Sequence, residues 1–249
     1  MPRKARQQGE SDIYHVIERG AGRQVIFEDS VDRRAYLLRL KQLLEEYEAT
    51  LLAWCLMDNH VHLLIKVSFA GLSSMMQRLG TGYAQYFNKR HEHVGFLFQN
   101  RFFSQPVDSD AYLQAVLRYI HMNPVKDGLC RSCGQYRWSS FHEFLAQDQG
   151  LCDKRYVLEL LGSRRDFLAL HRDGADDGLP ELHLPAIRPA DADLLLCLNR
   201  LLKEYNVADI RLLPREDRDR VIRELKSMGA TNKQVERLTG VGRGIVERL

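Results

Sequence analysis

The chain has 249 residues, of which 45% are hydrophobic and 28% charged, so it can build a folded core and global disorder is excluded. No apolar run reaches the roughly 20 residues of a membrane-spanning helix, and we expect a cytoplasmic protein without a membrane partner. The net charge of +3 permits nucleic-acid binding but does not by itself indicate it. Five scattered cysteines, an odd number, favour a reducing compartment over a disulfide framework.

The first 170 residues alternate between strand-like and helix-like patterns. Residues 29–49 place apolar side chains at helical spacing after an acidic start, which predicts an amphipathic helix. Asp58-Asn59 is a hairpin-like turn pair between two strand-like runs, and Gly80 and Gly82 favour a break in a later helix. In chain order, we predict a flexible basic arm (1–11), a strand (12–20), a helix (29–49), two strands (50–57 and 60–67) and two helices (71–91 and 108–129).

A change of composition divides the rest of the chain. Residues 171–192 hold three of the seven prolines and a net acidic charge, which predicts a linker. Residues 193–249 predict a small all-helical domain, with Thr231 and Gln234 as a capping box at one helix start. Two short helices joined by a glycine turn are typical of a helix-turn-helix, and a generic helical bundle is the alternative.

His60 and His62 lie in the strand-like run 60–67. Because side chains alternate along a strand, one face holds Val61, Leu63, Ile65 and Val67 and should pack on helices, whereas the other holds His60, His62, Leu64 and Lys66. Two imidazoles at this spacing can reach one metal ion or one scissile group. The alternative is a pair of ordinary exposed histidines. A second such pair, His91 and His93, lies among charges that predict a solvated loop, so spacing alone does not decide.

The run MDNHVHLLI, which contains both histidines, resembles the His-hydrophobe-His signature of the HUH endonucleases. The wider sequence resembles the single-tyrosine transposases of the insertion-sequence type, and most closely the REP-associated tyrosine transposases. Four further segments carry this resemblance: YHVIERGAGRQVIFED (14–29), GYAQYFNKRHEHVGFLFQNRFFSQPV (82–107), YLQAVLRYIHMNPVKDGL (112–129) and RWSSFHEF (137–144). Together they cover about residues 12 to 145.

The resemblance implies a ferredoxin-like core that cleaves and rejoins single-stranded DNA through a covalent 5′-phosphotyrosine, with a divalent metal. By position it implies Tyr119 as the nucleophile and His60, His62 and Asn123 as the metal ligands. A tyrosine hydroxyl has a pKa of about 10 and needs help to attack at neutral pH. Two imidazoles and an amide oxygen suit Mg²⁺ or Mn²⁺, with the histidines favouring Mn²⁺.

Alternatives remain open for the residues and for the function. Tyr112, seven residues before Tyr119 on the same helix face, is the leading rival nucleophile, and Tyr86 is the next. Without the resemblance, Tyr119 reads as a packing residue, and Asn123 before Pro124 reads as an ordinary helix stop. The function could also be that of a DNA-binding regulator that keeps the fold without the reaction. A different HUH enzyme, such as a replication initiator or a relaxase, is the third possibility.

We therefore predict an α+β protein. A catalytic domain over residues 12–170 holds an antiparallel sheet with helices on one face, and a helical DNA-binding domain follows the linker. Single-stranded and hairpin DNA are the expected partners of a monomer or a homodimer. The predicted DNA contacts are the cations Arg19, Arg23, Lys66, Lys89, Arg90, Arg101, Arg243 and Arg248.

Two other sequence features bear on the site. Near several of these cations the sequence places aromatic side chains, a mixture that suits single strands through phosphate pairing and base stacking: Phe96, Phe98, Phe102 and Phe103. The alternative is that the phenylalanines belong to the core and the cations are solvated, and we expect most of the phenylalanines to be core. Cys130 and Cys133 have the spacing of half a zinc site. Because the sequence has no second such pair, we interpret them as structural or incidental.

Overall fold

The computed structural model describes residues 6–99, 101–148, 150–172, 191–205 and 207–249. The chain separates into two compact units, one of residues 1–19 and 25–183 and the other of residues 20–24 and 184–249. Residues 1–5 of the predicted arm and residues 173–190 of the predicted linker lie outside the described residues. Within the described ranges, no helix has the length and apolar character that crossing a membrane requires.

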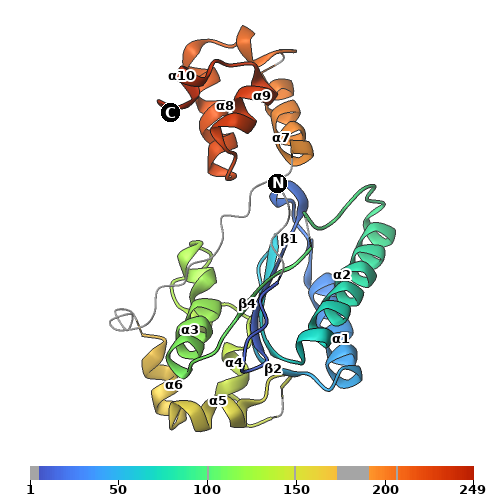
Figure 1. The fold of residues 1–249 in the computed structure, drawn as a ribbon, viewed down its shortest axis with the longest axis vertical. Helices are drawn as coiled ribbons and strands as arrows, with labels where there is room; N and C mark the ends of the chain where they lie inside the picture. Colours follow the sequence, from blue (N-terminus) through green and yellow to red (C-terminus); the bar gives the residue numbers. More distant parts are fainter. Residues whose placement is uncertain (1–5, 100, 149, 173–190, 206) are drawn as a thin grey trace. The chain divides into compact units, whose positions relative to one another are not determined.

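A four-stranded antiparallel sheet forms the centre of the first unit (Figure 1). Its spatial order is β2-β3-β1-β4, and the strands β1 to β4 span Ile13–Arg19, Thr50–Leu56, His60–Lys66 and Phe103–Pro106. The turn predicted at Asp58-Asn59 joins β2 to β3, and the Met57 N–H donates to the His60 carbonyl at 2.9 Å. With one helix after β1 and another after β3, the chain follows the ferredoxin-like order. The predicted α+β fold is confirmed.

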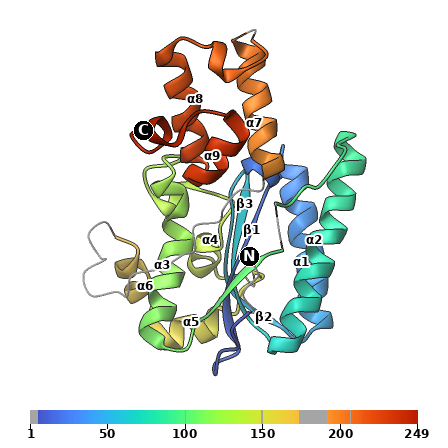
Figure 2. The same ribbon diagram turned by 45° about the horizontal axis from the view of Figure 1, so that its top comes forward.

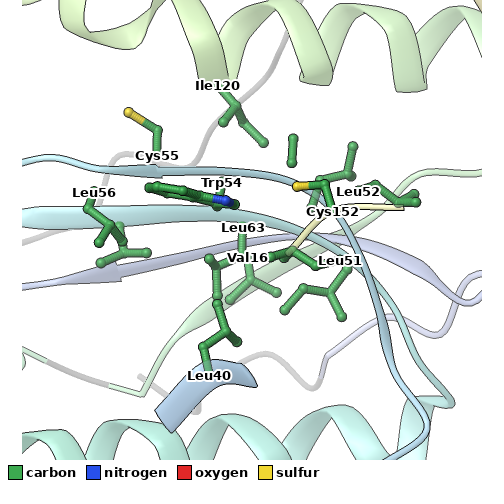
Figure 3. Packing of buried hydrophobic residues seen from close by; sticks show 14 of the residues in the cluster. Val16, Leu40, Leu51, Leu52, Trp54, Cys55, Leu56, Leu63, Ile120 and Cys152 are labelled. Atoms are coloured by element: carbon green, nitrogen blue, oxygen red, sulfur yellow. The ribbon is translucent and has the colours of Figure 1, made fainter. Parts of the chain in front are cut away.

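Two long helices, α1 (Ser30–Glu46) and α2 (Phe69–His91), cover one face of the sheet (Figures 1 and 2). Asp29 begins α1 by accepting hydrogen bonds from the backbone N–H groups of the first turn. Leu40 of α1 is fully buried and lies against the sheet near Val16 and Leu63 (Figure 3). The apolar face predicted for β3 is buried on this side, as expected.

The opposite face of the sheet is also covered. Helix α3 (Asp110–Lys126) packs on β2 and β3, and Ile120 approaches the sheet on the side of Cys55 (Figure 3). The short helices α4, α5 and α6 lie beside it and span Phe141–Leu145, Lys154–Leu161 and Arg164–Leu170. The predicted arrangement, with helices on one face of the sheet, therefore holds for α1 and α2 but not for the whole domain. The apolar stripe of α3 can be buried only against another apolar surface, and the second face of the sheet supplies it.

Three local expectations differ from the structure. Helix α2 runs unbroken through Gly80 and Gly82. A Cβ atom on Gly80 would lie 2.8 Å from Oε1 of Glu18, so this glycine allows α2 to approach β1 closely rather than breaking the helix. Helix α3 continues past Pro124 to Lys126, within the predicted range 108–129, so Asn123-Pro124 is not the helix stop. Strand β4 and helices α4 to α6 were not predicted, because such short elements show little periodicity.

The second unit is built from helices, as predicted. Its described helices are α7 (Asp191–Glu204), α8 (Arg215–Ser227), α9 (Asn232–Thr239) and α10 (Arg243–Val246). Short 3₁₀ segments, η1 (Ala21–Arg23) and η3 (Ile210–Leu212), also belong to this unit, whereas η2 (Cys133–Gln135) belongs to the first. The capping box of Thr231 and Gln234 is present at the start of α9. Leu194, Ile222 and Val235 are fully buried in a core of this unit's own. Helix α10 is a single turn, so Arg248 lies beyond it and not on the last helix as expected.

Candidate active site

The register of the sheet gathers polar side chains on the face that α3 covers. His60 pairs with Arg19 of β1, and His62 pairs with Ile17, so these four side chains point the same way. His60 is only 7% exposed and His62 only 2%. The alternative of two ordinary exposed histidines is therefore wrong, because the pair lies between the sheet and α3.

Helix α3 brings Tyr119 and Asn123 to the two histidines. The two residues are four positions apart, which places them one turn apart on the same helix face. The ring centroid of Tyr119 lies 5.4 Å from that of His62, in an edge-on arrangement. The side-chain oxygen Oδ1 of Asn123 lies 3.1 Å from Nε2 of His60. The four residues that the resemblance implied for catalysis thus come together from β3 and α3.

Each histidine has an outer partner on its second ring nitrogen. Nδ1 of His60 lies 2.7 Å from Oδ1 of Asn59, the residue before β3. Nδ1 of His62 lies 3.1 Å from Nε2 of His15 on β1, and the two rings stack with centroids 5.3 Å apart. Nε2 of His62 is buried and has no hydrogen-bond partner among the described residues. This nitrogen is therefore a potential ligand atom.

His15 was not predicted as a site residue. It is fully buried, and its ring also meets the Tyr119 ring edge-on at 5.9 Å. The signal that could have found it is strand alternation, because His15 and Arg19 occupy the same face of β1. What the sequence did not give was the register, which decides that this face lies beside His62.

Burial sets the protonation of the site. It lowers the pKa of His62 well below its ordinary value, and the neighbouring His60, His15 and Arg19 lower that pKa further. Burial also lowers the pKa of His15 to about 3. Both rings are therefore neutral near pH 7 and each keeps one lone pair.

Neighbouring groups shift the pKa of the Tyr119 hydroxyl in opposite directions. Burial raises the pKa of its hydroxyl, while a hydrogen bond from the Asn123 side chain lowers that pKa. Asp127 raises the pKa and Arg19 lowers it. On balance the pKa of the hydroxyl is raised, so Tyr119 requires further help to act as a nucleophile.

The residues present fit a divalent ion. Nitrogen and oxygen ligands about 2.1 Å from one octahedral ion lie about 3 Å from each other, and Nε2 of His60 and Oδ1 of Asn123 are 3.1 Å apart. The unpartnered Nε2 of His62 supplies a third donor atom. No group of three or more His, Cys, Asp or Glu side chains arranged as metal ligands occurs in the described part of the chain. A metal at this site would therefore depend on the amide oxygen as well as on the imidazoles.

Tyr119 differs from the other candidate tyrosines. In the described part of the chain, it is the tyrosine whose ring contacts both His15 and His62. Tyr83 is buried and donates its hydroxyl to the Ile26 carbonyl at 2.6 Å. Tyr86 lies on α2, which covers the other face of the sheet. Tyr112 lies two turns before Tyr119, at the start of α3. The geometry favours Tyr119 over both rivals.

Comparison with known proteins identifies the family that this chain resembles. Residues 10–123 match the family described as Transposase IS200 like. The resemblance to the single-tyrosine transposases is thereby confirmed. This range contains β1 to β4 and the four converging side chains.

Two relatives extend the comparison. A protein of Haemophilus influenzae whose assigned name is REP-associated tyrosine transposase is 29% identical over 113 residues, which cover 41% of this chain and 64% of the relative. The chain thus spans less than two thirds of that relative. The structure titled as the REP-associated tyrosine transposase bound to a REP hairpin covers 74% of this chain and 100% of its own, with a TM-score of 0.52 and 16% identity. This second likeness supports the fold.

The predicted DNA-contacting cations of the first unit fall into three groups. Arg19 lies at the site, since it pairs with His60 across the sheet. Lys66 is exposed at the other end of β3, roughly 20 Å from His60 at the rise of a strand. Lys89 and Arg101 are exposed. Arg90 forms ion pairs with Asp29 and Asp32, which gives its guanidinium a structural role.

The cations of the second unit are placed differently. Arg243 begins α10, and its Nε lies 2.6 Å from Oε1 of Glu247. Arg248 is exposed after the end of α10. Arg23 is half-buried in η1, a segment that groups with this unit, and has a φ of +62°. Arg248 is therefore the more available of the two contacts predicted near α10.

The four phenylalanines considered for base stacking differ in their exposure to solvent. Phe96 is 88% exposed, whereas Phe102 is only 8% exposed. Phe98 and Phe103 are half-buried. Phe102 lies under the guanidinium of Arg6, with its ring centroid 3.9 Å from Cζ, so part of the predicted arm is docked here. Phe96 is the most exposed of these four phenylalanines.

Two other motifs have structural positions. His91 is the last residue of α2, and its Nε2 lies 3.0 Å from Oδ2 of Asp32. His93 lies in the predicted loop, where residues 92 and 94–96 are exposed, and its Nδ1 lies 3.0 Å from Oδ1 of Asn88. Both therefore help to close the end of α2. The five cysteines are free thiols, and Cys133 is buried in the core.

Proposed function

We propose that the protein is a metal-dependent single-stranded DNA endonuclease and strand transferase that acts through Tyr119 and a covalent 5′-phosphotyrosine. The observation that carries the proposal is the convergence of Tyr119 and Asn123 with His60 and His62. Two of these side chains come from β3 and two from α3, and the ring of Tyr119 contacts that of His62. A packing role for Tyr119 alone would not require its ring to contact two buried histidines, His15 and His62.

His60, His62 and Asn123 would hold the metal through Nε2, Nε2 and Oδ1. A bound Mg²⁺ or Mn²⁺ supplies Lewis-acid polarisation of the scissile phosphate. Arg19, on the same face as His60, would pair with a phosphate oxygen. Asn123 also donates to the Tyr119 hydroxyl, which orients this oxygen and lowers its pKa.

In the cleavage step, the Tyr119 hydroxyl loses its proton and its oxygen bonds to phosphorus. The bond from phosphorus to the leaving 3′ oxygen breaks, and this oxygen takes a proton to become a free 3′-OH. A 3′-OH from the same or another DNA end can reverse the step. Rejoining needs no ATP, because the phosphotyrosine retains a phosphodiester bond.

Hairpin DNA is the proposed substrate class. The protein of the same fold whose structure was compared above is described as bound to a REP hairpin. In this chain, the exposed Phe96 and the cations Lys89 and Arg101 would hold the single-stranded part. The helical second unit, with Arg243 and Arg248, would add recognition of duplex DNA beside the cleavage position.

The test is a cleavage assay on hairpin oligonucleotides labelled at either end, with Mn²⁺ or EDTA. We expect a Mn²⁺-dependent product that carries protein on its 5′ end with the wild type and none with Tyr119→Phe. Tyr112→Phe is the matched control, since it removes a hydroxyl from the same helix, and it should cleave as the wild type does.

Two outcomes would contradict the proposal. An adduct that persists in Tyr119→Phe and disappears in Tyr112→Phe would transfer the role of nucleophile to Tyr112. Binding of hairpin DNA without cleavage of any oligonucleotide in a broad pool would favour a DNA-binding regulator that keeps the fold.

A further inference from the structure

We propose that His15 is a positioning residue that sets the tautomer of His62 and so presents Nε2 of His62 to the metal. The inference rests on the proposed function, because it concerns the same ion. It assigns a role to a residue of β1 that supplies no ligand and does not contact the substrate.

The geometry requires one proton between the two rings. Nε2 of His15 and Nδ1 of His62 lie 3.1 Å apart, a hydrogen-bond distance, and the stacked rings hold them there. A neutral imidazole has one N–H and one lone pair, so one ring donates and the other accepts. If His62 donates from Nδ1, its Nε2 keeps a lone pair. If His15 donates, Nε2 of His62 carries a hydrogen and cannot bind a cation.

The first arrangement matches the other histidine of the pair. Nδ1 of His60 lies 2.7 Å from Oδ1 of Asn59, and its Nε2 lies 3.1 Å from Oδ1 of Asn123. If Nε2 and the Asn123 oxygen both bind the cation, Nε2 needs its lone pair, and the proton of the ring is on Nδ1, donated to Asn59. Histidine ligands commonly donate their second N–H to such an outer partner, which fixes the tautomer and strengthens the ligand atom. His15 would accept the hydrogen bond from Nδ1 of His62, as Asn59 accepts the one from Nδ1 of His60.

Packing alone does not account for a histidine at this position. His15 is 0% exposed, and its Nδ1 is buried without a hydrogen-bond partner among the described residues. A buried polar atom without a partner destabilises the fold. An aliphatic side chain would fill the space without this cost. The contact with His62 gives the histidine a function that leucine cannot supply.

The tautomer can be observed directly in the unaltered, metal-free protein. A long-range ¹⁵N–¹H NMR spectrum of the histidine rings distinguishes Nδ1–H from Nε2–H. We expect the Nδ1–H form for His62, with its resonances assigned by their loss in His62→Gln. The Nε2–H form in the wild type would overturn the inference, whether or not any variant folds.

Mn²⁺ affinity, measured without DNA by the EPR signal of free Mn²⁺, supplies the second readout. We expect His15→Leu to weaken binding tenfold to a hundredfold, the usual range for loss of an outer partner. His15→Gln should recover most of the affinity, because Oε1 of glutamine can replace Nε2 as the acceptor. His142→Gln, at an exposed histidine on α4, is the control and should bind as the wild type does.

The outcomes separate this inference from the proposed function. Equal Mn²⁺ affinity in His15→Leu and the wild type would overturn the role of His15 while the metal site stands. Loss of affinity in both His15→Leu and His15→Gln, with unchanged thermal unfolding, would also count against an acceptor role. A wild type that binds no Mn²⁺ and forms no adduct would overturn both proposals.

Discussion

The carboxamide oxygen of Asn123 lies 3.1 Å from Nε2 of His60, although 63 positions of sequence separate the two residues. The same side chain hydrogen-bonds to the Tyr119 hydroxyl and lowers its pKa. Asn123 therefore connects the proposed nucleophile to a proposed metal ligand. The side chain thus has two proposed tasks, since its oxygen would bind the metal and its N–H group would donate to Tyr119.

Asn123→Asp should separate these two tasks. A carboxylate keeps a metal ligand and adds negative charge, so Mn²⁺ affinity should be equal or higher. It cannot donate to Tyr119 and would raise the pKa of the hydroxyl, so formation of the phosphotyrosine should slow about tenfold or more. Single-turnover adduct formation at saturating Mn²⁺ measures this rate. Unchanged adduct formation would show that the Asn123 N–H does not assist Tyr119.

Glu18 gives the fold a pH dependence on the face away from the histidines. Burial raises its pKa to about 7 from an ordinary 4.5, although a hydrogen bond from the Tyr36 hydroxyl at 2.9 Å lowers it in part. The folded protein holds a proton that the unfolded chain releases, so stability falls as pH rises from 4.5 to 7 and is level above that. The loss is at most about 3 kcal/mol.

Glu18→Gln should remove this component. Urea unfolding at several pH values should show the free energy of unfolding of the variant, relative to the wild type, increasing between pH 4.5 and 7. Glu28→Gln, at an exposed position, should parallel the wild type. A constant difference between Glu18→Gln and the wild type across this range would show that Glu18 titrates normally.

His121 anchors the helix that carries Tyr119 and Asn123. Its Nε2 lies 2.7 Å from Oγ of Ser140, and its Nδ1 lies 2.9 Å from Nε2 of His171. Ser140→Ala leaves a buried nitrogen without a partner and should reduce the free energy of unfolding by about 1–3 kcal/mol. Chemical denaturation measures this loss, and Ser132→Ala at an exposed position should be neutral. No loss in Ser140→Ala would remove the structural role of this contact.

His171 should contribute acid sensitivity through the same cluster. Burial lowers its pKa to about 4 from an ordinary 6.5. The unfolded chain therefore binds a proton that the folded protein does not, and stability present above pH 6.5 is lost as pH falls towards 4. His171→Gln should reduce this slope in unfolding experiments between pH 7 and 4. An unchanged slope would place the acid sensitivity elsewhere.

Phe96 should contribute to DNA affinity without contributing to stability. It is 88% exposed, so Phe96→Ala should change the free energy of unfolding by less than about 0.5 kcal/mol. Loss of one stacked base should weaken single-strand binding by about 1–3 kcal/mol. Fluorescence anisotropy with a labelled single strand measures the affinity. Val94→Ala, two positions away and 94% exposed, is the matched control, and equal affinities of the two variants would exclude stacking on Phe96.

Arg243 and Arg248 should act on duplex DNA. Removing one phosphate contact should weaken duplex binding and reduce the slope of log affinity against log salt by about 1. Arg248→Ala should have the larger effect, since Arg243 is held by Glu247. Titrations at several salt concentrations measure the slope. Mn²⁺-dependent nicking of an unstructured single strand should be unchanged, and its loss would place these residues in the catalytic reaction.

Local spacing in the sequence determined much of this site. Alternation along a strand put His60 and His62 on one face, and helical spacing put Asn123 one turn after Tyr119. The turn at Asp58-Asn59 and the capping box at Thr231 were likewise readable, because each depends on residues within a few positions. The family resemblance then joined the two local patterns into one predicted site.

Tertiary structure alone decided what surrounds these residues. Strand register, which depends on pairing over long sequence distances, placed His15 against Nδ1 of His62. The packing of α3 on the second face of the sheet buried the histidines and set their pKa values. On the other face, the packing of α2 gives Gly80 its role, because this glycine allows Glu18 to approach α2 and does not break the helix. Such contacts join segments far apart in the chain, so no local pattern records them.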